Sequence, residues 1–82
     1  MTDADRAALA ERAQSTARGM ILLDGPTFAH RLTMLEGVLF ADLTGHGHTP
    51  ADALAACSIY ADAARAERER LAANDQQYGG MQ

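Results

Sequence analysis

The stretch TFAHRLTMLEGVLFADL, residues 27–43, decides the fold. Large apolar residues recur in it at spacings of three and four, which places them along one side of an α-helix. This pattern predicts a helix over residues 27–43 with one buried face. The stripe consists of Phe28, Leu32, Leu35, Leu39 and Leu43.

This predicted helix is apolar on more of its circumference than a single buried face requires. Met34 and Val38 widen the stripe on one side, and Phe40 lies on the other side. A helix that is apolar around most of its circumference is normally surrounded by other elements. We therefore expect the helix over residues 27–43 to be the central element of the fold.

A first helix is predicted upstream, over residues 3–24. Thr2 is a good N-cap residue, and the apolar stripe of this helix continues without a break through Met20 and Leu23. Gly25 is then expected to cap its C-terminus in a left-handed conformation.

A third helix is predicted over residues 50–73. Thr49 is placed to cap it, and Pro50 suits the first helical position. We expect Tyr60 at the edge of its apolar stripe, and an Arg65–Glu69 ion pair on its exposed side. The predicted stripe is Leu54, Cys57, Ala61, Ala64 and Leu71.

The chain is predicted to be all-α, a small three-helix bundle formed by a single domain of residues 1–74. Residues 75–82 lack periodicity and end in glycine and polar residues, so we expect a flexible tail. A domain in a chain of 82 residues is near the size at which a core needs further support. The single cysteine excludes an internal disulfide, so we expect self-association, as a homodimer, through the central helix.

Composition narrows the classes of partner. The net charge of −4 argues against nucleic-acid binding, which requires a basic surface. No apolar run approaches the roughly 20 residues that cross a bilayer, and the acidic N-terminus does not resemble a signal peptide. We expect a cytoplasmic protein that binds neither membrane nor nucleic acid.

The stretch LTGHGHTPAD is the strongest candidate for chemistry, because it holds His46 and His48 between glycines. A metal site there would need a third ligand, which Asp42, Asp52 or His30 could supply. The competing interpretation is a solvated turn between two helices, for which glycine and polar residues are typical. We favour the turn and keep a small metal-binding domain as an alternative.

No other pattern indicates catalysis. Cys57 has no neighbouring base in the predicted stripe and is expected to be a small buried hydrophobe. The sequence contains no glycine-rich phosphate loop with its lysine. We identify no catalytic, cofactor-binding or metal-binding residue, and expect a protein that is not an enzyme and needs no cofactor. The roles of Arg65, Arg68 and Arg70 are left open.

The feature that stands out is surplus apolar surface off the main stripes, which typically marks a protein interface. These residues are Phe40, Met34, Ile59, Ile21 and Leu22. We expect a non-catalytic module that binds a protein partner of unknown identity, as an adaptor or an inhibitor of a larger complex. Small domains of this style occur among phage and mobile-element accessory proteins. A self-assembling structural component is the other alternative.

Overall fold

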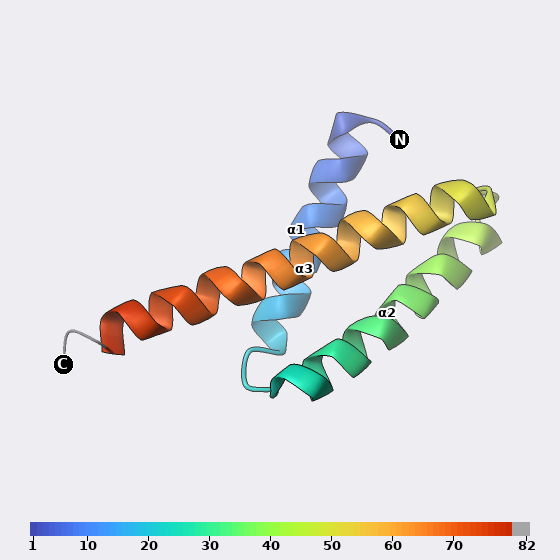
Figure 1. Cartoon of the computed structure of the whole chain (residues 1–82). Helices are drawn as coiled ribbons and strands as arrows, with labels where there is room; N and C mark the ends of the chain where they lie inside the picture. Colours follow the sequence, from blue (N-terminus) through green and yellow to red (C-terminus); the bar gives the residue numbers. More distant parts are fainter. Residues whose placement is uncertain (80–82) are drawn as a thin grey trace.

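The chain forms three α-helices in a computed structural model that describes residues 1–79, with side chains for residues 1–74. The helices are α1 (Asp3–Gly19), α2 (Gly25–Gly45) and α3 (Pro50–Gly79), as Figure 1 shows. The described residues include no β-strand. The prediction of an all-α, three-helix bundle is confirmed.

Helix α3 occupies the centre of the bundle. It packs against both other helices: α1 crosses it steeply on one side, and α2 runs beside it after the turn that joins them (Figure 1). Within the described residues, no Cα atom of α1 lies within 8 Å of a Cα atom of α2. Our expectation that the helix over residues 27–43 would be central is therefore wrong. Helix α3 takes the central place because it buries two adjacent strips of its surface, one against α1 and one against α2.

The start of α1 follows the sequence prediction. The Thr2 side chain accepts a hydrogen bond from the Asp5 backbone N–H at 3.1 Å, and the Asp5 carboxylate accepts one from the Thr2 N–H. This reciprocal pair satisfies two donors that a helix N-terminus leaves free.

The end of α1 comes earlier than predicted. The helix stops at Gly19, and the Asp24 carboxylate caps α2 by accepting a hydrogen bond from the Thr27 N–H at 2.7 Å. Gly25 therefore begins α2 and does not cap α1. Glycine has low helix propensity and aspartate is among the best N-caps, so the chain turns between them.

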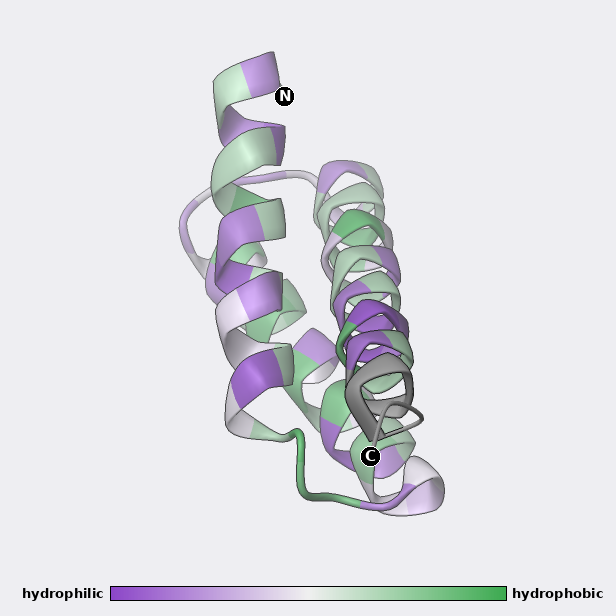
Figure 2. Ribbon diagram, turned by 90° about the vertical axis from the view of Figure 1, so that its left-hand side faces the viewer, coloured by the Kyte–Doolittle hydropathy of each residue, from purple (hydrophilic) through white to green (hydrophobic). Residues whose placement is uncertain are grey.

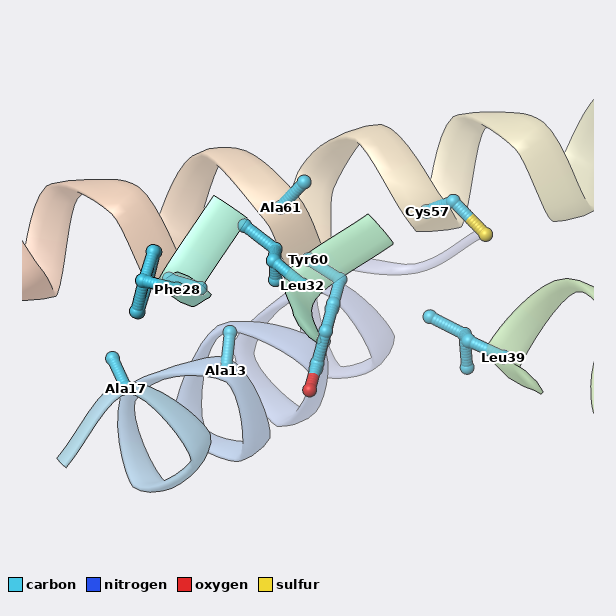
Figure 3. Close-up of a cluster of buried hydrophobic side chains, with 9 residues drawn as sticks. Ala13, Ala17, Phe28, Leu32, Leu39, Cys57, Tyr60 and Ala61 are labelled. Carbon is cyan, nitrogen blue, oxygen red and sulfur yellow. The ribbon is translucent and has the colours of Figure 1, made fainter. Parts of the chain in front are cut away.

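The hydrophobic core lies where the three helices meet (Figure 3). Phe28, Leu32 and Leu39 are buried in it, and Leu35 and Leu43 pack against it, which confirms the predicted stripe of α2. The other buried members are mostly alanine, which adds little apolar area but lets helices approach closely. They are Ala13, Ala17, Cys57, Tyr60, Ala61 and Ala64.

The buried face of α3 is rotated from the predicted one. Leu54, expected in the stripe, is 62% exposed, whereas Tyr60, expected at its edge, is 3% exposed. The Tyr60 hydroxyl donates a hydrogen bond to Thr16 Oγ1 of α1 at 2.8 Å. A buried tyrosine needs such a partner for its O–H, so this contact fixes the rotation of α3 against α1.

An ion-pair cluster also joins α1 to α3. The side chain of Glu67 is 4% exposed and accepts hydrogen bonds from Arg18 of α1 at 3.0 Å and from Arg70. The guanidinium group of Arg70, and to a lesser extent that of Arg18, holds the pKa of the Glu67 carboxyl below its usual value. Glu67 is buried as a carboxylate because both of its oxygens are paired.

Two further arginines have defined roles. The Arg68 guanidinium lies 4.9 Å from the centre of the Phe28 ring and donates to the Leu23 carbonyl at 3.4 Å. Arg68 therefore covers the core where α2 begins. Arg65 pairs at 3.5 Å with Asp62, in place of the expected Glu69.

Helix α3 is longer than predicted and reaches Gly79, past the expected end at residue 73. The segment NDQQY contains no helix-breaking residue, so the first stop signal is the glycine pair that begins at Gly79. Residues 80–82 of the predicted flexible tail lie outside the described residues. No described helix has the length and apolar character needed to span a membrane.

Candidate functional site

Helix α2 carries apolar side chains on the side that faces away from the core. Met34 is 60% exposed and Val38 is 62% exposed, although the same helix buries Phe28, Leu32 and Leu39. They are one helical turn apart and therefore adjacent on the surface. Folding of the single chain leaves them uncovered.

Two charged residues lie on the same side as these apolar ones. Arg31 stands one turn before Met34, and Asp42 stands one turn after Val38; both are exposed. With Ala41, these residues fall within an arc of about 100° at ideal helical geometry. We call Arg31, Met34, Val38, Ala41 and Asp42 the α2 outer face.

The α2 outer face borders a shallow groove of about 400 Å³. Met20, which follows the end of α1, forms one wall of the groove, and Arg31 and Met34 form part of the other. His30 and Leu35 complete its lining. His30 is exposed, and its side chain belongs to the rim of this groove.

The turn between α1 and α2 exposes a second apolar site. Leu22 is 96% exposed and Ile21 is 43% exposed, and Figure 2 shows this connection as a hydrophobic stretch between the two helices. The caps at Met20 and Asp24 fix both ends of the turn. Leu22 contributes almost nothing to the core, so the fold does not explain a leucine there.

The other two predicted interface residues are less available. Phe40 is half-buried and packs against the core, and Ile59 is also half-buried. The exposed part of the predicted interface is therefore Met34, Ile21 and Leu22. Sequence reasoning had left out Leu54, which is as exposed as Val38 but stands on α3.

The two histidines of the α2–α3 connection point to different neighbours. His46 Nδ1 lies 2.7 Å from the Asp42 carbonyl oxygen and 3.5 Å from Asp42 Oδ1. Gly47 adopts φ +94°, a left-handed conformation that turns the chain. Thr49 then caps α3 by accepting a hydrogen bond from the Asp52 N–H at 3.2 Å.

His48 instead lines a cavity of about 290 Å³ beside the N-terminal half of α1. Asp5 and Asp52 lie on the same cavity, but among the described residues no three histidine, cysteine, aspartate or glutamate side chains are grouped as a metal site would require. The geometry supports the turn interpretation of this segment and does not support the metal-binding alternative.

Cys57 is buried, as the sequence predicts. Its Sγ donates to the Glu36 carbonyl at 3.3 Å, and burial raises the pKa of the thiol above its ordinary value. A protonated, buried thiol is a poor nucleophile. Its position is that of a small core residue between α2 and α3.

Comparison of the chain with protein-family models, with curated proteins and with solved structures finds no match. The candidate site therefore rests on geometry alone. Its two components are the α2 outer face and the exposed turn at residues 21–22.

Proposed function

We propose that this protein is a non-catalytic module that binds another protein through exposed apolar surface. The observation that carries this proposal is the turn between α1 and α2, where Leu22 is 96% exposed. Capping interactions fix both ends of this turn, so it presents its apolar side chains in a defined shape. An exposed leucine beside a second apolar side chain suits a pocket on a partner.

The α2 outer face adds a second apolar surface on the same molecule. Two separate surfaces suit an adaptor or an inhibitor that associates with itself and still presents a free patch to a larger complex. The small size agrees with accessory proteins of phages and mobile elements, by analogy of style only. A cytoplasmic location belongs to this proposal.

The test is capture of partners by the full, tagged chain from lysate of its native host, read by mass spectrometry. Leu22→Asp removes the apolar side chain of the turn without touching the core. Leu54→Asp makes the same chemical change at another exposed leucine, on α3, and serves as the matched control.

We expect a foreign protein, recovered in stoichiometric amount by the wild type and by Leu54→Asp, to be lost with Leu22→Asp. Equal recovery by Leu22→Asp, or no foreign protein with any of the three chains, would contradict the proposal. Recovery of only the protein's own copies would favour a self-assembling structural component.

A further inference from the structure

We infer that the α2 outer face binds the same face of a second copy of this chain, with the two α2 helices antiparallel. The inference deepens the proposed function and rests on it only in treating exposed apolar surface as protein-binding. Its basis is the distribution of charge along the face.

The face is basic at one end and acidic at the other. Arg31 stands toward the N-terminus of α2 and Asp42 stands toward its C-terminus, eleven positions later, with apolar Met34 and Val38 between them. Arg31 makes no ion pair or side-chain hydrogen bond within the part of the chain that the structure describes. Among the described residues, the carboxylate of Asp42 meets only His46, at 3.5 Å.

An antiparallel pairing matches these charges twice. A two-fold axis that lies between the two helices, at the level of residues 36 and 37, places Arg31 of each copy at the level of Asp42 of the other. The same axis places Met34 of one copy at the level of Val38 and Ala41 of the other, so apolar residues meet apolar residues. The two ion pairs are about 16 Å apart, from the helical rise over eleven residues.

The other arrangements fit less well. A parallel pair would set Arg31 against Arg31 and Asp42 against Asp42, which repel. A foreign partner would need the opposite charge pattern at the same spacing, whereas a second copy supplies that pattern through symmetry. The chain carries a net charge of −4, so two copies repel overall and favour contact through a face that is mostly uncharged.

Charge reversal tests this arrangement directly. In Arg31→Glu, acid faces acid at both ends of the interface, and in Asp42→Arg, base faces base. Both positions are exposed, so neither change disturbs the core. The double variant Arg31→Glu/Asp42→Arg restores both pairs with their signs exchanged. An equimolar mixture of the two single variants also restores both pairs, in a heterodimer.

The measurement is sedimentation equilibrium of the full chain over a range of concentrations. We expect the wild type and the double variant to approach twice the monomer mass of 8.7 kDa. Each single variant should show a dimer dissociation constant raised by about tenfold or more. The mixture of single variants should recover the dimer, and Leu54→Glu, on α3, should dimerise as the wild type does.

A wild type that remains monomeric overturns the inference, as do single variants that dimerise unchanged or a mixture that stays monomeric. These failures are distinct from failure of the proposed function. A monomeric chain that captures a foreign protein through Leu22 overturns the dimer alone. A charge-paired dimer that captures no foreign protein supports the inference while the proposed function fails.

Discussion

Alanine substitution at two glycines should change stability in opposite directions. Gly37 lies in the middle of α2, and a Cβ atom added there would meet nothing within 4 Å. Its φ is not positive, so alanine fits the native backbone. Glycine inside a helix costs about 1 kcal/mol relative to alanine, and we expect Gly37→Ala to raise the free energy of unfolding by about that amount.

The matched substitution is Gly47→Ala. A Cβ atom there would also meet nothing within 4 Å, but φ is +94°. A left-handed backbone costs a residue with a side chain about 1–2 kcal/mol, so we expect the free energy of unfolding to fall by that amount. Only backbone conformation separates the two sites, because both are open to solvent.

Thermal unfolding followed by far-ultraviolet circular dichroism measures both effects. For a domain of this size, 1 kcal/mol corresponds to a change in Tm of roughly 4–8 °C. Measurement at two protein concentrations separates the effect on the fold from any effect on association. If Gly37→Ala leaves the Tm unchanged or lowers it at both concentrations, the reasoning from open space and helix propensity is refuted.

Four further outcomes are expected. Leu32→Ala, at a fully buried position, should lower the free energy of unfolding by about 2–5 kcal/mol in urea titrations, and a smaller loss would mean that the core collapses around the site. Tyr60→Phe removes the hydrogen bond to Thr16 and should cost about 1 kcal/mol in the same assay, with no loss if water replaces it fully. The hydrogen bonds from Thr27 hold the pKa of Asp24 below its usual value, so the ionised cap stabilises the fold above the unfolded pKa and this stabilisation is lost as pH falls through the folded pKa. Asp24→Asn, which still caps, should therefore show a weaker loss of Tm between neutral and acidic pH, and an unchanged loss would contradict this assignment. Cys57 should react with a thiol reagent only at the rate at which the chain opens, because it is buried and its pKa is raised; rapid labelling of the native protein would show that it is accessible.

Helix α2 could be predicted closely because its large side chains make the periodic signal unambiguous. The C-terminal end of α1 could not be predicted in the same way, although Met20 and Leu23 do pack against the core as their stripe implies. They reach the core from the non-helical connection that follows Gly19. The spacing of apolar residues alone does not distinguish such a connection from a continuation of the helix.

The face of α3 could not be predicted from its sequence for a different reason. Alanine stands on all sides of this helix, so the apolar pattern scarcely favours one rotation over another. Two polar contacts across the helix pair, Tyr60 with Thr16 and Glu67 with Arg18, accompany the observed rotation. Each joins residues more than 40 positions apart, which single-sequence patterns do not reveal.

The candidate site was partly predictable. Surplus apolar residues on α2 and in the segment that follows α1 indicate an interface. Of these residues, Met34, Ile21 and Leu22 are exposed as expected. The angle of Phe40 on α2 places it off the main stripe and so in the predicted interface, yet Phe40 is half-buried and packs against the core. The helix angle of a residue says which way it faces, but not how far a neighbouring helix extends over it.

The central position of α3 bears on how the fold forms. Helices α2 and α3 are joined by the short connection at residues 46–49, so they can pair as a local hairpin at small entropic cost. Helix α1 docks on that hairpin mainly through small side chains such as Ala13 and Ala17, together with a few polar contacts. Docking of α1 on α3 instead brings together residues 44 and 49 positions apart, Tyr60 with Thr16 and Glu67 with Arg18, so this contact closes the longest loop of the fold and carries its largest entropic cost.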